Sequence, residues 1–216
     1  MPLGFEPIAD VWLAHVRDQG NAWYGVNATA FLEALPPPGR ATLEIGTGEG
    51  RFGRALVAAG HRVIGVDVSP TLAALARETF PVVEADAAAL PFDDASFDLV
   101  VAFMSLMDIE DMAGAVREAA RVVEPGRRVS ASIVHPILST GEGEPFTIAR
   151  PYLATHRYVE RMVTSPDVEL ESIHRPLEAY TRAFEDAGLL IVELRELQGV
   201  RRPHLPISLH LHAVKR

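Results

Sequence analysis

Residues 43–53 read Leu-Glu-Ile-Gly-Thr-Gly-Glu-Gly-Arg-Phe-Gly, an apolar start followed by four glycines in eight positions. Glycine this dense directly after an apolar run indicates a backbone that turns sharply or comes very close to a ligand. Residues 48–53 also match the G-x-G-x-x-G pattern of dinucleotide-binding turns. That match is short, so the remainder of the chain has to decide what this turn binds.

The composition is that of an ordinary globular protein. The chain has 216 residues, of which 48% are hydrophobic and 23% charged, and this predicts a single domain, 1–216, with a sizeable core. The net charge of −9 repels polyanions on average, so we expect neither a nucleic-acid nor a membrane partner. There is no cysteine, no run of about eighteen apolar residues, and no basic start typical of a secretory signal. We expect a cytoplasmic monomer or homodimer.

Apolar, strand-like runs alternate with helical patterns over the first two thirds of the chain. We expect strands over 41–46, 61–69, 81–86, 97–103 and 127–135. We expect helices over 8–18, 27–35, 51–59, 71–80 and 111–122, the fourth preceded by Ser69 as N-cap and Pro70. Near-continuous apolar strands separated by helices predict a parallel sheet covered on both faces, and right-handed crossovers make it doubly wound.

Beyond His135 the alternation stops. Two alternating segments, 157–164 and 167–174, flank Ser165-Pro166 and predict a small antiparallel hairpin. A helix (175–188), a strand (189–198) and an alternating segment (206–216) follow, and two strands joined by a short loop most simply pair antiparallel. The predicted fold class is therefore α/β: a doubly wound seven-stranded sheet, mostly parallel with an antiparallel C-terminal strand.

Five segments, in their order and spacing, resemble the motifs of class I S-adenosylmethionine-dependent methyltransferases, in the small-molecule group related to ubiquinone and menaquinone methylases. These segments are residues 43–53, 65–70, 97–111, 117–129 and 174–189. Within the first, Glu44 to Gly50 matches the acidic-x-G-x-G-x-G pattern of these enzymes. The resemblance covers residues 10–131 and 174–215. It implies a Rossmann-like methyltransferase fold with S-adenosylmethionine as cofactor.

The resemblance also implies which residues bind the cofactor. Gly46, Gly48 and Gly50 would turn the chain off the first strand, so that backbone amides face the polar methionine part. Glu44 would orient this turn, and Asp67 would accept two hydrogen bonds from the ribose. The other implied residues are Thr47 in the turn, Val68, Asp86 and Ala87 at the adenine, Phe103 and Met104 near the reacting end, and Tyr24 in an N-terminal helical lid, 1–38. Asp86 could instead be a solvated carboxylate, and Phe103 and Met104 could be core residues.

Two other functions stay open at this point. An NAD-dependent oxidoreductase explains the glycines and Asp67 equally well, but a short-chain dehydrogenase needs a Tyr-x-x-x-Lys pair. The single lysine, Lys215, has Leu211 four residues before it. A two-domain dehydrogenase would need a longer chain. The second alternative is a non-catalytic S-adenosylmethionine-binding scaffold, against which the intact cofactor motifs argue.

Methyl transfer is an in-line displacement, for which the protein must align the nucleophile and exclude water. A hydroxyl nucleophile also needs a base, and three residues stand where the family forms its acceptor pocket: His135, His174 and Asp108. The metal ligands of catechol-type enzymes are missing from the motifs, so we expect no metal site. We expect methylation of an O or N atom, rather than carbon, of a small organic acceptor.

The insertion, 136–174, is expected to cover this acceptor. Its candidate lining residues are Arg150, Tyr152, Tyr158 and Met162. His210 and His212 alternate on the last predicted strand, and we interpret them as a solvated face rather than a metal pair.

Overall fold

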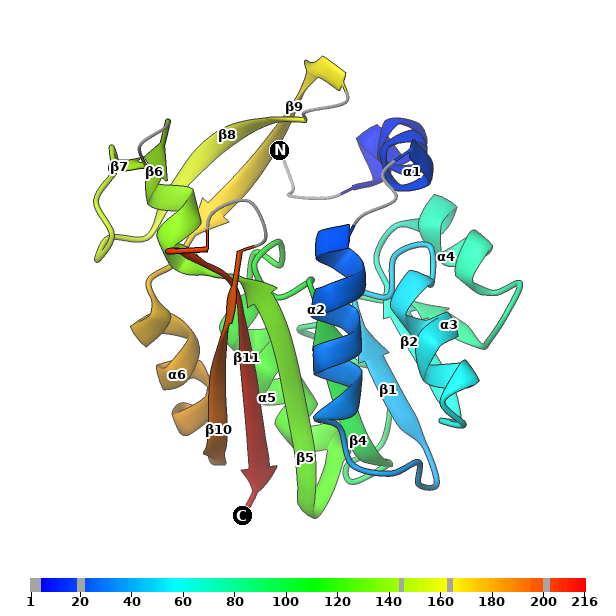
Figure 1. Ribbon diagram of the computed structural model, residues 1–216. Coiled ribbons are helices and arrows are strands. Elements are labelled where there is room, and N and C mark those ends of the chain that lie inside the picture. Colours follow the sequence, from blue (N-terminus) through cyan, green and yellow to red (C-terminus); the bar gives the residue numbers. More distant parts are fainter. Residues whose placement is uncertain (1–4, 19–21, 144–145, 163–164, 200–202) are drawn as a thin grey trace.

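A seven-stranded sheet with the strand order β10-β11-β5-β4-β1-β2-β3 organises the chain (Figure 1). The computed structural model describes residues 5–18, 22–143, 146–162, 165–199 and 203–216. The strands of the sheet are β1 Thr42–Ile45, β2 Val63–Asp67, β3 Val82–Glu84, β4 Phe97–Phe103, β5 Val123–Val134, β10 Leu189–Gln198 and β11 Pro206–Lys215. The helices are η1 Glu6–Ile8, α1 Ala9–Asp18, α2 Ala22–Glu33, α3 Arg51–Ala58, α4 Pro70–Ala76, α5 Met112–Val122, η2 Pro136–Thr140 and α6 Leu177–Asp186.

The pairing of the strands confirms the predicted fold class. Strands β1 to β5 pair in parallel, whereas β11 runs antiparallel to both of its neighbours, β5 and β10. The predicted boundaries hold to within a few residues, apart from α2, which begins five residues earlier than expected, and β5, which begins four residues earlier. Ser69 caps α4 as predicted, since its side chain accepts a hydrogen bond from the Leu72 amide.

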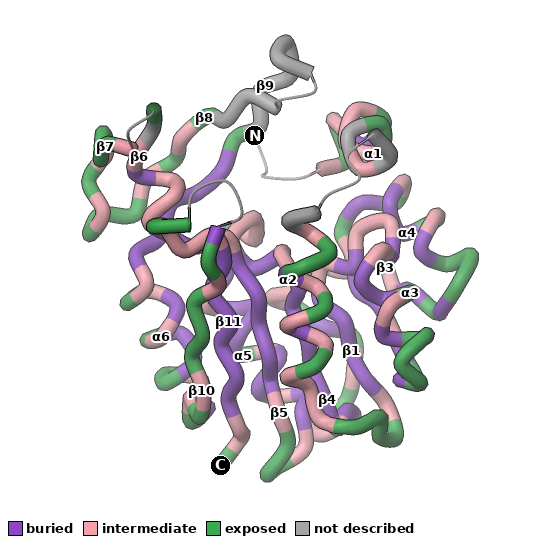
Figure 2. The backbone as a smooth tube through the Cα atoms, in the orientation of Figure 1, coloured by how far each residue is buried: buried purple, intermediate pink, exposed green. Residues whose placement is uncertain are grey.

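Helices cover both faces of the sheet, which explains the continuous apolar runs of the strands. In β4, Val100 and Ala102 belong to the core cluster that contains α5 and α6. The intervening Leu99, Val101 and Phe103 belong to the cluster that contains α2, α3 and α4. The middle strands are accordingly buried along most of their length (Figure 2).

The prediction of a solvated face at His210 and His212 is wrong, because both are buried, with 1% and 0% exposure. Strand β11 lies inside the sheet, between β5 and β10, and Phe31 of α2 packs on both imidazoles. His210 Nε2 hydrogen-bonds Asn27 Oδ1 at 2.7 Å, and His212 Nδ1 hydrogen-bonds Ser130 Oγ at 2.9 Å. Burial lowers the pKa of His210 to about 4, so it is a neutral hydrogen-bonding core residue.

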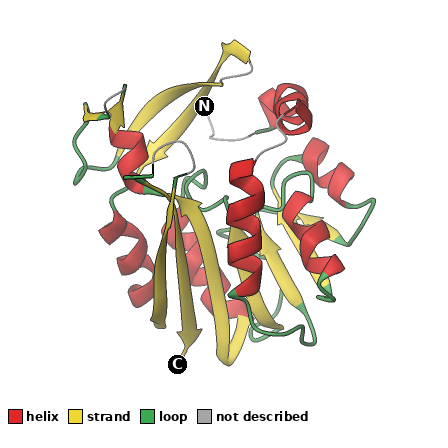
Figure 3. Cartoon of the chain, in the orientation of Figure 1, coloured by secondary structure: helices red, strands yellow, loops and turns green. Residues whose placement is uncertain are grey.

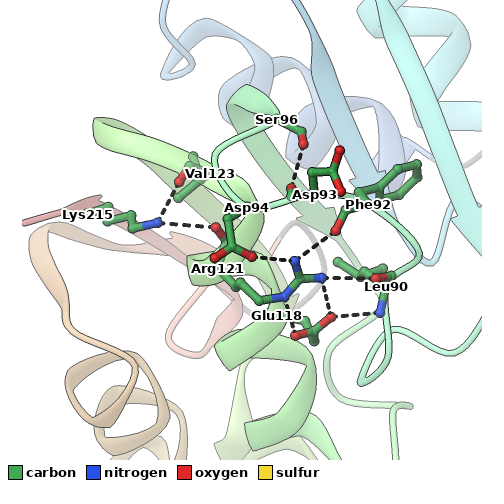
Figure 4. Close-up of polar contacts among 9 residues, drawn as sticks. All are labelled: Leu90, Phe92, Asp93, Asp94, Ser96, Glu118, Arg121, Val123 and Lys215. Carbon is green, nitrogen blue, oxygen red and sulfur yellow. Dashed lines mark hydrogen bonds and ion pairs between the residues drawn. The ribbon is translucent and has the colours of Figure 1, made fainter.

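Arg121 of α5 fixes the loop between β3 and β4 (Figure 4). Its guanidinium donates to the carbonyl oxygens of Leu90 and Phe92 at 2.9 and 2.8 Å. It also pairs with Asp94 and Glu118, both at 2.7 Å. The single lysine, Lys215, donates to the carbonyls at 121 and 123. This lysine therefore supports the same end of α5 and is remote from the glycine turn.

Two small hairpins lie beyond β5 (Figure 3). Strands β8 (His156–Met162) and β9 (Ser165–His174) pair antiparallel, which confirms the predicted hairpin, although residues 163–164 lie outside the described part. The other hairpin, β6 (Gly141–Glu142) with β7 (Thr147–Ile148), lies in a segment for which the sequence predicts no strand. The hairpin β8–β9 and α1 both stand over the carboxyl ends of the parallel strands (Figure 1). Within the described residues, no helix has the length and apolar character needed to cross a membrane.

The glycine turn between β1 and α3 uses left-handed backbone, as the sequence predicts. Gly46, Gly48 and Gly50 have φ angles of 68°, 55° and 83°. A Cβ at Gly46 would lie 2.4 Å from the Cβ of Ser105, whereas a Cβ at Gly48 would meet nothing within 4 Å. Gly46 is therefore required by packing as well as by conformation, and Gly48 by conformation alone.

This difference gives a matched pair of variants. Gly46→Ala should lower the free energy of unfolding by about 3 kcal/mol, because backbone strain and a steric clash add together. Gly48→Ala should cost about 1 kcal/mol, because only the strain applies. Urea unfolding measures both values, and equal losses would contradict the proposed role of the contact with Ser105.

Candidate functional site

A cavity of about 530 Å³ opens at the carboxyl ends of the parallel strands. Most of the residues implied by the resemblance meet there. Those on its wall are Tyr24, Glu44, Gly46, Thr47, Gly48, Asp67, Val68, Asp86, Ala87, Phe103, Met104, Asp108 and His135. Gly50 and His174 are not on the wall. The turn at the end of β1, which the sequence singles out, therefore lies on the wall of this cavity.

Gly50 serves packing instead of lining the cavity. A Cβ at this position would lie 2.9 Å from the Cβ of Ala76 and 3.2 Å from the ring of Phe80. The glycine thus lets the turn close onto α4 behind the cavity wall.

The expectation that the amides of the turn face a ligand is wrong for four of them, because they donate within the protein. The amides of Gly46 and Thr47 donate to the Val66 carbonyl at 2.8 and 3.0 Å. The Gly48 amide donates to Asp67 Oδ2 at 2.7 Å, and the Gly50 amide donates to the Thr47 carbonyl at 2.9 Å. Acceptor groups at the end of β2 and in the turn itself therefore accept the hydrogen bonds of these four amides. These four amides are thus not free to bind a charged ligand group in this part of the cavity.

Glu44 lies buried beneath the turn, with 1% exposure. Thr47 donates its hydroxyl hydrogen bond to Glu44 Oε2, which fixes the carboxyl group as the cofactor motif requires. The pKa of Glu44 is raised to about 8, chiefly by burial; the nearby carboxyl groups of Glu49 and Asp67 act in the same direction, and the Thr47 hydrogen bond opposes them. No cation pairs with this carboxyl among the described residues.

Asp67 ends β2 and faces the turn. Its Oδ1 accepts a hydrogen bond from the Ser69 amide at 2.9 Å, and its Oδ2 accepts from the Gly48 amide at 2.7 Å. Each carboxylate oxygen has a second lone pair, so Asp67 can accept two ligand hydroxyls while it holds the turn. Burial raises its pKa, and the amide bonds oppose this rise. Val68 beside it is 62% exposed, on the cavity wall.

At the end of β3, Asp86 is exposed, and its Oδ1 accepts from the Ala88 amide at 2.8 Å. Asp86 therefore combines the two alternatives, since it is a solvated loop carboxylate that also lines the cavity.

Phe103 and Met104 lie where β4 ends. Phe103 stacks on Phe52 with ring centroids 4.2 Å apart and is largely a core residue, although it reaches the cavity wall. Met104 has a φ of 57°, an uncommon conformation for a non-glycine residue. Asn27 Nδ2 lies 3.4 Å from the Met104 sulfur and connects α2 to this strand end.

The N-terminal segment forms one side of the cavity through Phe5, Trp12 and Val16. Glu6 attaches it to the cofactor motifs, because its carboxylate accepts from the Thr71 amide at 3.1 Å and the Thr71 hydroxyl at 2.7 Å, and also from the Ser69 hydroxyl. The side chain of Trp23, next to Tyr24 in the chain, lies outside the described residues.

His135 ends β5 on the cavity wall. Its Nε2 lies 2.8 Å from Glu196 Oε1, and its Nδ1 accepts from the Ile137 amide at 3.2 Å. Burial lowers the pKa of His135, and Glu196 opposes this. Nδ1 therefore has its hydrogen bond, whereas Nε2 lies close to Glu196 without hydrogen-bond geometry and is left without a hydrogen-bond partner in the described structure. The nearby Asp108 follows β4 and also lines the cavity.

His174 lies off the cavity wall and has both ring nitrogens engaged. Its Nε2 donates to the Tyr152 carbonyl at 2.7 Å, and its Nδ1 lies 2.6 Å from Ser139 Oγ. Burial lowers its pKa. It joins η2 to the segment before β8 and is not available to an acceptor. Of the insertion residues expected to line the acceptor site, Tyr158 is on the wall, Arg150 and Tyr152 are not, and the side chain of Met162 lies outside the described residues.

Arg175 and Tyr180 are wall residues that the sequence did not reveal. Arg175 is 7% exposed and donates to the carbonyls of residues 107, 109 and 110 at 3.1, 2.7 and 2.9 Å. It also hydrogen-bonds Tyr180, whose pKa burial raises to about 12. Arg175 thereby fixes the loop that carries Asp108. In the sequence only its position before Pro176 distinguishes Arg175. This signal is too weak to predict that the residue lines a cavity.

Comparisons with known proteins identify the family to which a chain with this fold and cavity belongs. Residues 43–130 match the family described as a methyltransferase domain. The demethylmenaquinone methyltransferase of Corynebacterium kroppenstedtii is 31% identical over 76% of this chain and 74% of its own length. The chain belongs to the S-adenosylmethionine-dependent methyltransferases. A demethylmenaquinone methyltransferase of Chlorobaculum tepidum is 35% identical over 62% of this chain, which is 58% of that relative's length.

Solved structures support the same fold. A putative S-adenosylmethionine-dependent methyltransferase from Listeria monocytogenes superposes with a TM-score of 0.73 over 89% of this chain and 99% of its own, at 14% identity. The protein is thus a methyltransferase with S-adenosylmethionine as cofactor, and the oxidoreductase and scaffold alternatives are set aside.

The cavity fits this cofactor. Open space lies in front of Gly48, and the hydroxyl of Tyr24 and Oε1 of Glu49 are buried on the wall without a hydrogen-bond partner in the described structure. Such groups need partners. Asp67 would bind the ribose, Val68 and Ala87 would contact the adenine, and Met104 would lie near the reacting end.

The raised pKa of Glu44 predicts how stability varies with pH. The folded protein holds this carboxyl neutral. Its contribution to the free energy of unfolding is therefore complete below the ordinary glutamate pKa of 4.5 and is lost as the pH rises through about 8. Each pH unit in that window costs up to about 1.4 kcal/mol. Glu44→Gln has no such titration and can still accept from Thr47, so its stability relative to the parent should increase from pH 5 to pH 8.

Urea unfolding of the ligand-free protein at both pH values measures this difference. Exposed Glu78 supplies the control, and Glu78→Gln should show the same relative stability at both. A Glu44→Gln difference that does not change with pH would contradict a neutral Glu44.

Proposed function

We propose that this methyltransferase transfers the methyl group of S-adenosylmethionine to an O or N atom of a small organic acceptor, by a metal-independent in-line displacement. The observation that carries the proposal is the composition of the cavity beyond Met104. There the wall combines apolar residues with convergent polar groups: Val134, Pro136 and Ile173 with Asp108, His135, Ser139, Tyr158 and Tyr180. Such a mixture is typical of small-molecule sites, in which a few polar groups orient an otherwise apolar ligand.

S-adenosylmethionine supplies an electrophilic methyl group on a sulfonium. The residues of the chain then have to orient the acceptor and accept its proton. His135 suits the second task, because Glu196 beside Nε2 stabilises the imidazolium that forms when Nδ1 accepts a proton. The long contact of Nδ1 with the Ile137 amide, 3.2 Å, is weak enough to be exchanged for an acceptor hydroxyl.

Asp108 is the second proton acceptor that we propose. Arg175 holds its loop through three carbonyls, so the carboxylate keeps a fixed position on the wall. Among the described residues, no group of three His, Asp or Glu side chains is arranged to hold a metal ion.

The N-terminal lid and the insertion exclude water in this proposal. Phe5 and Trp12 approach the cavity from one side, and Tyr158 and Ile173 from the other. Helix α1 packs against β9, so the two segments meet above the reacting groups. Exclusion of water protects the transfer from solvent and strengthens electrostatic contacts within the site.

The relatives support a small acceptor without fixing its identity. Those reported above are named demethylmenaquinone methyltransferases. Apart from the loop that carries Asp108, the acceptor half of the cavity is formed by residues within 134–180, which lie outside the family match over 43–130.

A panel assay tests the proposed function. Phenols, carboxylic acids and amines are incubated with the protein and S-adenosylmethionine, and the demethylated cofactor and the methylated product are measured by mass spectrometry. We expect turnover of a hydroxyl, carboxyl or amine compound that EDTA does not reduce. A methyl group found on carbon, or an absolute need for a divalent ion, would overturn the proposal.

The role of His135 has its own test. His135→Ala should lower kcat with such an acceptor by about tenfold or more, because the proton acceptor is lost. The affinity for the demethylated cofactor, measured by calorimetry, should stay unchanged, since His135 lies on the acceptor side. His204, exposed and away from the cavity, provides the control variant His204→Ala. An unchanged kcat in His135→Ala would remove His135 from the mechanism.

A further inference from the structure

The charged end of the cofactor meets a turn whose amides are largely in use. An amino-acid tail carries a carboxylate and an ammonium group, and each needs a partner of opposite charge or a hydrogen bond when it leaves water. The amides at 46, 47, 48 and 50 already donate to protein acceptors. Side chains on the adjacent wall can supply the recognition that these four amides do not.

Arg51 is the cation in the right place. It is the first residue of α3 and lines the cavity directly after the turn. Its guanidinium carbon lies 3.6 Å from the centre of the Tyr24 ring, a cation–π contact that fixes the plane of the guanidinium. Among the described residues, no carboxylate lies within ion-pair distance of Arg51. Its charge is thus held in position without being neutralised.

Two buried polar atoms of the cavity wall have no hydrogen-bond partner in the described structure. They are the hydroxyl of Tyr24 and Oε1 of Glu49, both on residues of the cavity wall. Burial raises the pKa of Tyr24, so its hydroxyl stays protonated and can donate. Glu49 Oε1 can accept. One unused donor and one unused acceptor on the same cavity wall as the Arg51 guanidinium match the two ends of a zwitterion.

We propose that side chains, rather than the amides of the turn, read the amino-acid end of the cofactor: Arg51 and the Tyr24 hydroxyl bind its carboxylate, and Glu49 Oε1 binds its ammonium group. Tyr24 belongs to α2 and Arg51 to α3, so the carboxylate joins the N-terminal lid to the glycine turn. The inference concerns the cofactor alone and holds whichever acceptor is methylated.

Ligands that lack parts of the tail test this assignment. Calorimetry compares S-adenosylhomocysteine, its decarboxylated analogue, and methylthioadenosine, which has no amino-acid tail. Arg51→Met keeps the stem on the Tyr24 ring but removes the charge. This variant should lower the affinity for S-adenosylhomocysteine by about 10- to 100-fold, the range for a hydrogen bond to a charged group. The affinity for methylthioadenosine should stay unchanged.

The other two variants separate the two ends of the tail. Tyr24→Phe removes only the hydroxyl, and should weaken S-adenosylhomocysteine but not the decarboxylated analogue. Glu49→Gln should lower the affinity for both of these ligands, because both carry the ammonium group. The affinity for methylthioadenosine should again stay unchanged.

Arg62→Met, which alters an exposed arginine that does not line the cavity, is the control and should leave all three affinities as in the parent. Because each variant is compared across ligands, a general loss of folding cannot imitate the expected pattern. An Arg51→Met variant that weakens S-adenosylhomocysteine and methylthioadenosine equally, or weakens neither, would overturn the proposal.

Discussion

The close contact between Gly46 and Ser105 is the constraint on which the rest of the site depends. The two residues follow the neighbouring parallel strands β1 and β4, and Ser105 Oγ donates to the Ile45 carbonyl at 2.7 Å. No side chain fits at position 46, since its first carbon would overlap Ser105. The turn of the cofactor motif and the loop that leads to Asp108 are therefore set in register by one contact. The cofactor half and the acceptor half of the cavity owe their alignment to it.

A second principle is the distribution of charge along the cavity. Glu49 and Asp67 place two carboxyl groups beside the turn, whereas burial raises the pKa of Glu44 to about 8 and keeps its carboxyl neutral. Carboxylates on the wall stabilise a positive ligand group, which suits a sulfonium. On the acceptor side the charged residue Arg175 has a structural role. It is buried, donates to backbone carbonyls and supports a loop instead of binding a ligand. The protein thus uses its charges for different purposes at the two ends of one cavity.

Much of this could be derived from the sequence because local patterns carry it. The apolar runs gave the strands, the glycines gave the turn, and Ser69 with Pro70 gave the start of α4. Each of these depends on residues close together in the chain. The motif order then identified the family, since spacing between motifs reflects the order of strands in the sheet.

The remaining features depend on distant partners, which the sequence does not display. His210 and His212 alternate like an exposed strand, but their environment is decided by Phe31 of α2 and by the two neighbouring strands. The amides of the turn were expected to be free, and the end of β2 takes them. In the same way, nothing local to residues 175 and 180 indicates that both line the cavity with Asp108.

The network around Asn27 has a consequence for how the molecule is made. Its side-chain amide accepts from Ser208 Oγ at 3.0 Å and from His210 at 2.7 Å, and also contacts Ser132. During synthesis α2 leaves the ribosome early, but the strand that satisfies its buried amide emerges some 180 residues later, as the separations of 181 and 183 positions show. The buried amide of α2, the helix that carries Tyr24, therefore gains these partners only once β11 has entered the sheet between β5 and β10. Competence to bind the cofactor then depends on a strand made long after the helix that it completes.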